Sequence, residues 1–227
     1  MSKNLKYDNN QIFNVALTGL LLSFSLIALF ISKYLGWLVF PEIGLKFDLS
    51  FLFIFAIFYF VNHYYGFIAL IIRFIFGPFI TVNSDVVGWI GHFILFTSNL
   101  IFIIIFFLLN FLLKKINNYK KKFIVFSVAI ISTSLIMTFL NYFLFTPLYF
   151  KIFGLSDGFF FNDTIKAWEI KKQLFKTSLN FLEFCLILFL PFNLTVYTFS
   201  SIFIIFIILF VEKNYNLKKI GKNNNKS

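Results

Sequence analysis

Long apolar runs separated by short polar segments dominate this sequence. Four runs reach the length of a membrane crossing, at residues 12–31, 88–113, 123–145 and 191–211. A helix rises by about 1.5 Å per residue, so a run of about 20 residues spans roughly the 30 Å hydrocarbon core of a bilayer. Each of the four runs therefore predicts a transmembrane helix.

Two shorter apolar runs, residues 51–61 and 66–76, are separated by a polar break at residues 62–65. They predict a pair of short or tilted membrane helices with an inner turn, and a re-entrant hairpin is the alternative. Arg73 lies near the outer end of the second run. Because a charge at mid-membrane is costly, we expect its side chain to snorkel or to face a wet cavity.

A last short run, residues 181–190, ends at Pro191 and is too short to cross a bilayer alone. We expect it to lie in the outer interface, since a seventh span would require it to cross by itself. The pattern thus predicts an all-α membrane protein with six transmembrane helices. Residues 12–213 form its membrane domain, with an outer insertion at 146–177.

The segment 41–50, PEIGLKFDLS, is the most polar and turn-rich piece near the first two spans. Pro41 and Gly44 break regular structure, and Asp48 and Ser50 are helix-capping residue types. The segment therefore predicts a short loop that closes over the end of the first helix and starts the next. Within the insertion, Asn162 or Asp163 is expected to cap a helix.

Composition supports lipid as the solvent, because 60% of the 227 residues are hydrophobic and only 13% are charged. Soluble domains are about one quarter charged. The single cysteine, Cys185, excludes an internal disulfide. Two histidines far apart in sequence, with no Cys/His cluster, predict no metal site.

The distribution of lysine predicts the orientation in the membrane. With six spans both chain ends share a side, which carries two lysines in the tail 1–11, five at 114–122 and five from 213 onward. The opposite side carries seven, diluted by acidic residues. Both termini are therefore expected in the cytoplasm of a cell-membrane protein, with residues 214–227 as a disordered tail.

Motifs for catalysis are missing from the sequence. It contains no HExxH, no GxSxG and no phosphate-binding glycine loop. The sequence therefore predicts no enzyme. A membrane-embedded enzyme built on Ser84, Asp85 and His92 is one alternative, and an assembly protein without a ligand is another. Any active transport must draw its energy from ATPases on other subunits.

Polar side chains near prolines suggest a binding site at outer membrane depth. Asn141 and Tyr142 precede Pro147, and Asn193 follows Pro191. An amide in lipid needs hydrogen-bond partners, and helix-to-helix bonding is the bland explanation for each. Convergent amides and aromatic side chains beneath a loop also suit a flat heteroaromatic solute, since one amide both donates and accepts.

Five segments then carry a family resemblance. FPEIGLKFDLS, YYGFIALIIRFIFGP, VVGWIGHF, NYFLFTPLY and PFNLT occur in this order. Together they resemble the substrate-binding S components of energy-coupling-factor (ECF) vitamin transporters, and most nearly the riboflavin-binding branch. Val196 stands where that branch usually has a lysine, so another vitamin such as folate or pantothenate is the runner-up ligand.

The resemblance implies a six-helix S-component bundle that binds a vitamin near the outer face and needs no cofactor. It implies association with a transmembrane coupling subunit and two ATPases, through a small-xxx-small motif matched by Gly19 and Ser23. It also implies a set of ligand contacts in the two amide motifs and in the loop between the first two helices. These are Asn141, Tyr142, Asn193, Leu45, Lys46 and Phe47.

Overall fold

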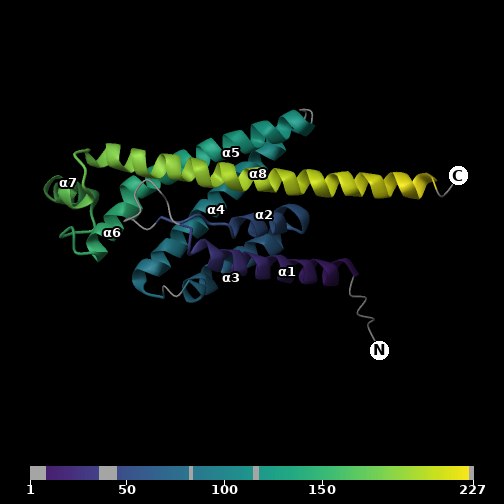
Figure 1. Cartoon of the computed structure of the whole chain (residues 1–227), viewed down its shortest axis with the longest axis horizontal. Coiled ribbons are helices and arrows are strands. Elements are labelled where there is room, and N and C mark those ends of the chain that lie inside the picture. The colour runs from purple at the N-terminus through teal and green to yellow at the C-terminus, as the bar shows by residue number, and fades with distance from the viewer. Residues whose placement is uncertain (1–8, 36–44, 82–83, 115–117, 225–227) are drawn as a thin grey trace.

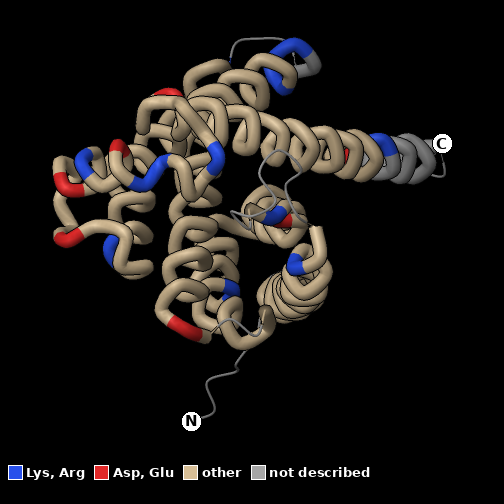
Figure 2. Tube along the Cα trace, turned by 60° about the vertical axis from the view of Figure 1, so that its left-hand side comes forward, with Lys and Arg blue, Asp and Glu red and all other residues tan. Residues whose placement is uncertain are grey.

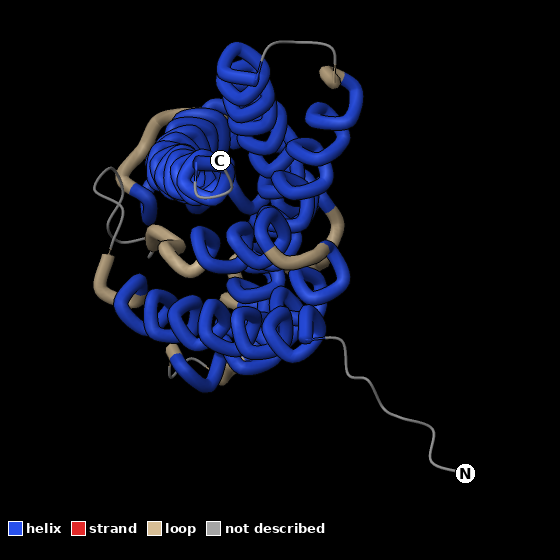
Figure 3. The backbone as a smooth tube through the Cα atoms, turned by 90° about the vertical axis from the view of Figure 1, so that its right-hand side faces the viewer, coloured by secondary structure: helices blue, strands red, loops and turns tan. Residues whose placement is uncertain are grey.

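The computed structural model describes residues 9–35, 45–81, 84–114 and 118–224. Within these ranges the regular structure is helical, and Figure 3 shows no strand among them. The elements are α1 (Asn9–Ser32), α2 (Phe51–Phe60), α3 (His63–Ile80), α4 (Val86–Leu112), α5 (Asn118–Leu140), the π-helix η2 (Asn141–Phe145), α6 (Thr146–Ile152), α7 (Phe161–Lys171), the 3₁₀ helix η3 (Lys172–Phe175) and α8 (Phe181–Asn224).

The long helices run side by side, and both ends of the described chain lie at the same end of the bundle (Figure 1). We call this the terminal end. The opposite end carries α6, α7 and η3, and we call it the pocket end. Charged positions gather toward the two ends and leave long uncharged stretches of helix between them (Figure 2).

Among the described residues, five segments are long and apolar enough to cross a membrane. They are Gln11–Ser32, His63–Ile80, Val86–Leu112, Lys120–Ile152 and Phe181–Lys213. The helix α2 has ten residues, about 15 Å at the helical rise, which is half a hydrocarbon core. The chain is thus an all-α, multi-pass membrane protein. The sixth crossing stays a prediction because it depends on α2.

Aromatic side chains from α2 and α4 build the main core. Phe55 of α2 packs edge-on against Phe106 of α4, with ring centres 4.8 Å apart, and Phe51 lies 5.2 Å from Phe102. All four are at most 3% exposed. Such edge-to-face pairs are favourable beyond the area they bury. The core holds α2 inside the bundle despite its short length.

The helix α8 differs from its prediction because Pro191 does not interrupt it. The helix runs unbroken from Phe181, so residues 181–190 are its first turns and are not a separate interfacial segment. An interior proline removes one backbone donor and crowds the carbonyl four residues earlier, but membrane helices tolerate this where neighbouring groups satisfy the freed carbonyl. The backbone is helical to Asn224, where the sequence predicted a disordered tail from residue 214.

A second, smaller core explains why those first turns stay with the bundle. Trp168 of α7 is fully buried and donates its Nε1–H to the Leu179 carbonyl at 3.0 Å. Its ring lies 4.5 Å from that of Phe184, on the first turns of α8. The insertion 146–177 is therefore packed against α8. Its helix α7 begins at Phe161 without a side-chain cap, so the predicted Asn162 or Asp163 cap is wrong.

Candidate functional site

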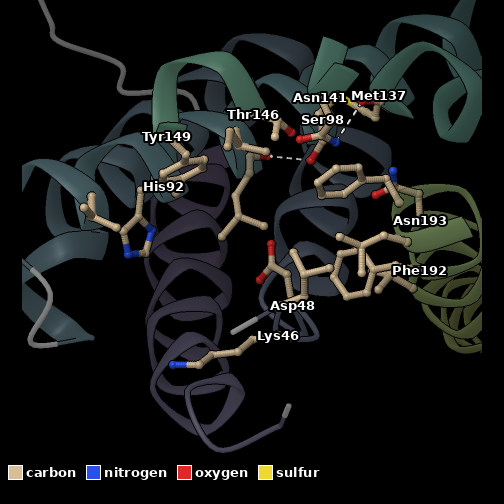
Figure 4. A pocket seen from close by; sticks show the side chains of 18 of the residues that line it. Lys46, Asp48, His92, Ser98, Met137, Asn141, Thr146, Tyr149, Phe192 and Asn193 are labelled. Carbon is tan, nitrogen blue, oxygen red and sulfur yellow. Dashed lines mark hydrogen bonds between the residues drawn. The ribbon is translucent and has the colours of Figure 1, made fainter. Parts of the chain in front are cut away.

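A cavity of about 1030 Å³ lies at the pocket end. Its walls come from α1, the segment 45–48, the start of α2, α4, the end of α5, η2, α6, η3 and the first half of α8. Pockets for small organic ligands commonly measure 300–1,000 Å³, so this cavity has the volume of a small-molecule site. Figure 4 shows side chains from separate helices converging on it.

The segment 45–50 enters the bundle and is fastened to α1 at two levels. Leu49 donates its backbone N–H to Ser32 Oγ at 2.9 Å, and Ser25 Oγ donates to the Ser50 carbonyl at 3.1 Å. Ser25 and Ser32 lie two turns apart on α1, so the segment runs down into the helical layer. The predicted loop therefore forms an inner wall of the cavity in its described part. Residues 41–44 lie outside the described residues.

A buried ion pair anchors the same segment to α3. Arg73 Nη2 lies 2.6 Å from Asp48 Oδ2, and the two side chains are 0% and 4% exposed. Arg73 Nε also donates to Ser50 Oγ at 2.6 Å. The expectation that Arg73 snorkels or faces a wet cavity is wrong, because its charge is neutralised inside the protein.

Asp48 accepts four hydrogen bonds in this network. Its Oδ1 accepts from the Ser50 backbone N–H at 3.0 Å and from the Ser50 hydroxyl, and its Oδ2 accepts from Arg73 and from Asn99 Nδ2 at 3.3 Å. Burial by itself raises the pKa of the Asp48 carboxyl. The Arg73 charge and these hydrogen bonds outweigh it and hold the pKa below its ordinary value.

The predicted capping residues, Asp48 and Ser50, lie next to the start of α2, but only Ser50 occupies the N-cap position. Ser50 is the N-cap residue of α2, but its side chain makes no capping hydrogen bond. Asp48 accepts from the backbone N–H of Ser50, two residues further along, and its other bonds come from the Ser50 hydroxyl, Arg73 and Asn99. The pairing of Asp48 with Arg73 could not be read from local sequence, because the two residues are 25 positions apart.

The two predicted amides line the cavity from separate helices (Figure 4). Asn141 begins η2, is 6% exposed and donates Nδ2–H to the Met137 carbonyl at 2.8 Å. Asn193 of α8 is 8% exposed, and its Nδ2 has no partner among the described residues. A π-helical turn shifts the side chains that follow it, and such turns occur often at functional sites.

Of the other predicted contacts, Leu45, Lys46 and Phe47 line the cavity and Tyr142 does not. Tyr142 instead packs against Phe161 and Phe181, with ring centres 4.8 and 5.2 Å away. The structure thus separates Tyr142 from the cavity-lining residues, since consecutive helical positions point in different directions.

The cavity wall also contains polar residues that the sequence did not single out as contacts, among them Ser98, Asn99 and Thr81. His92 lines the wall, and its Nε2 lies 3.0 Å from Thr81 Oγ1. Asp85, the suggested catalytic neighbour of His92, instead accepts from the Gly88 N–H at 2.9 Å as the N-cap of α4. No group of three metal-ligating side chains occurs in the described ranges.

The predicted partner-contact residues lie on the outside of α1. A side chain added at Gly19 would meet no atom within 4 Å, and Ser23 is exposed. Ser23 Oγ donates to the Gly19 carbonyl at 2.9 Å, which satisfies the hydroxyl within the helix. The described part of the chain leaves this small-residue face uncovered.

Comparisons with known proteins add a relative without an assigned role. Over 150 residues, 66% of this chain, the sequence is 29% identical to an uncharacterized protein of Mycoplasma pneumoniae, the MG350.1 homolog. The match spans 64% of that protein, so the chain covers less than two thirds of the relative's length. No family model matches the chain. No solved structure matches it either.

Proposed function

We propose that this protein is the substrate-binding S component of an ATP-driven ECF-type vitamin importer. The observation that carries the proposal is that two amide side chains, Asn141 and Asn193, line one cavity. That cavity has the segment 45–48, between the first two helices, as a further wall. A membrane protein with a ligand-sized internal cavity and no enzyme motif suits capture of a solute better than catalysis.

The chemistry of the wall supports a planar, polar ligand. Phe47 and Phe192 pair across the cavity wall with ring centres 6.1 Å apart, which offers apolar faces to a ring system. Asn193 Nδ2 has no partner in the part of the chain that the structure describes, and the burial of such a donor is unfavourable unless a ligand accepts from it. Riboflavin is the leading ligand, and folate or pantothenate is the alternative within the same class.

The partners in this proposal are a transmembrane coupling subunit and two ATPase subunits, in a cell membrane with both termini cytoplasmic. The uncovered Gly19 and Ser23 face of α1 supports a helix of the coupling subunit as a neighbour, since small side chains let two helices approach closely. The pocket end then faces outward, where it meets the solute.

Thermal unfolding of the detergent-purified protein with riboflavin, folate or pantothenate tests the proposal. A ligand at 100 times its Kd stabilises the folded state by about 2.7 kcal/mol, which raises the Tm. We expect one vitamin to do so, and a yellow chromophore to co-purify if that vitamin is riboflavin. The absence of any Tm shift with all three would reject ligand capture and leave the assembly-protein alternative.

A further inference from the structure

Two adjacent phenylalanines project from the pocket end outside the crossing segments. Phe159 is 62% exposed and Phe160 is 79% exposed, and both lie in the turn between α6 and α7 (Figure 1). This turn belongs to neither of the crossing segments that flank it, Lys120–Ile152 and Phe181–Lys213. Adjacent rings in water lose the favourable burial of their apolar surface, so an apolar neighbour that covers them would stabilise the protein.

The exposed rings are continuous with the lipid-facing side of the bundle. Phe143 lies in the crossing segment Lys120–Ile152 and is 54% exposed. Its ring centre is 5.1 Å from that of Phe161, the first residue of α7, which directly follows Phe160. Phe143 also lies near the end of the span predicted at 123–145. The turn therefore stands beside the membrane boundary, where lipid is the apolar neighbour within reach.

Hydrogen bonds within the turn fix the backbone from which the two rings project. Lys151 Nζ donates to the Asp157 carbonyl at 2.5 Å, and Ser156 Oγ donates to the Gly158 carbonyl at 2.9 Å. Lys151 Nζ also lies 5.6 Å from the Phe159 ring centre. A lysine that keeps its ammonium among polar groups while its stem covers apolar surface is typical of the boundary between lipid and water.

The start of α7 gives a separate reason to look for a role at Phe160. Phe160 is the N-cap residue of that helix, and it makes no side-chain capping hydrogen bond. Serine, threonine, aspartate or asparagine ordinarily occupies this position and satisfies a backbone N–H of the first turn. Asn162 and Asp163 follow within three residues but do not take the position. The chain thus keeps a large apolar side chain where a capping residue would be expected.

We propose that Phe159 and Phe160 form an interfacial anchor, which inserts into the boundary between the headgroups and acyl chains of the phospholipid bilayer at the pocket end. The aromatic rings then lie among acyl chains, with Lys151 beside the headgroups. The anchor also steadies the cavity, because Trp168 of α7 packs 5.2 Å from Phe175, which lines it. This inference does not rest on the proposed function.

Nitroxide labels on single cysteines, in nanodiscs of phosphatidylcholine and phosphatidylglycerol, test where the turn lies. The one native cysteine, the buried Cys185, is first replaced by alanine. We expect a label at Phe160→Cys to be more accessible to oxygen, which concentrates among acyl chains, than to a water-soluble nickel complex. Lys166→Cys is the matched control, since Lys166 is exposed on α7 about 120° round the helix from Phe160. Its label should favour nickel.

A conservative variant keeps the test free of any disturbance by the label. Phe160→Trp retains an aromatic ring, and its added fluorescence should be quenched in vesicles whose lipids carry bromine on the acyl chains, relative to the same lipids without bromine. Fluorescence of the parent is subtracted to remove the contribution of the native tryptophans. Lys166→Trp should lose less of its added fluorescence.

The possible outcomes each decide the proposal. An oxygen-favoured label at Phe160→Cys and a quenched Phe160→Trp support the anchor. A nickel-favoured label, or a Phe160→Trp quenched no more than Lys166→Trp, overturns it and leaves the turn in water. Poor access of both reagents, with spin–spin broadening between labels, also overturns it and places a second copy of the chain on the rings. None of these measurements uses a vitamin, so failure of the anchor leaves the proposed function standing.

Discussion

Asp48, which lines the cavity, and Arg73, which does not, form a buried ion pair of 2.6 Å. The pair joins the segment between α1 and α2 to the middle of α3, seven residues before that helix ends at Ile80. It therefore fixes the depth at which the segment enters the bundle, and with it the position of Leu45, Lys46 and Phe47.

Removing one partner of this pair should be more damaging than removing both. Arg73→Met leaves a buried, uncompensated carboxylate, and Asp48→Asn leaves a buried guanidinium, so we expect each to lower the free energy of unfolding by about 3–5 kcal/mol. The double variant should recover a large part of that loss. Chemical unfolding in detergent measures all three. If the single variants are as stable as the parent, the ion pair does not contribute to the stability of the fold.

The same pair predicts a dependence of stability on acid. The folded-state pKa of Asp48 lies below its ordinary 3.8. Its contribution is therefore fully present above pH 3.8 and is lost as the pH falls through the lowered pKa. We expect the contribution of Asp48 to the free energy of unfolding to be constant near neutral pH. It should fall only in strong acid. Asp48→Asn should remove that component, and an unchanged acid profile in this variant would assign it to other carboxyls.

Asn193 should show opposite effects on stability and on binding. Its Nδ2 is buried without a partner among the described residues, so Asn193→Leu removes an unsatisfied donor and should raise the stability of the ligand-free protein by about 1 kcal/mol or more. The same change should weaken vitamin binding by about 1–3 kcal/mol. Thermal unfolding and calorimetry measure the two effects.

Asn141→Leu is the comparison for that variant. Asn141 already donates to the Met137 carbonyl, so its replacement should bring no gain in stability while it weakens binding. If both leucine variants bind the vitamin as the parent does, neither amide contacts the ligand.

Trp168 should stabilise the insertion 146–177 at the pocket end. Trp168→Ala removes a fully buried ring, which is expected to lower the free energy of unfolding by about 3–5 kcal/mol. Trp168→Phe keeps most of the volume but loses the hydrogen bond to Leu179, so a loss near 1 kcal/mol is expected. Limited proteolysis should cut Trp168→Ala within residues 146–177 before the bundle unfolds. Equal protease resistance of parent and Trp168→Ala would show that this core does not hold the insertion.

Two glycines on different faces give a matched pair of predictions. An added side chain at Gly66 would lie 2.5 Å from the Phe58 ring, whereas at Gly19 it would meet nothing within 4 Å. Gly66→Ala should therefore destabilise the isolated protein by about 1–3 kcal/mol, and Gly19→Ala should not.

Under the proposed function, Gly19→Leu should leave vitamin binding intact and reduce co-purification with the coupling subunit, because a large side chain keeps the partner helix away. Retention of the coupling subunit by Gly19→Leu at the parent's level would place the partner interface on another face.

The sequence by itself determined that the protein is helical and membrane-embedded. Apolar runs such as residues 88–113 specify lipid-spanning helices locally, since every backbone group in a helix is satisfied within the segment. The break before α3 was also readable, and there the Asn62 side chain accepts from the Tyr64 N–H at 2.9 Å. Residue types near prolines pointed to Asn141 and Asn193, which the structure brings to one cavity.

Only the tertiary structure decided which polar groups are partners. Nothing local links Asp48 to Arg73 or Trp168 to α8, because these contacts arise when elements distant in sequence pack together. The path of α8 through Pro191 was set in the same way, since packing of its first turns on the Trp168 core favours continuation over a break. Rotation of each helix about its axis, which excluded Tyr142 and admitted His92 to the cavity, is likewise a property of the packed bundle.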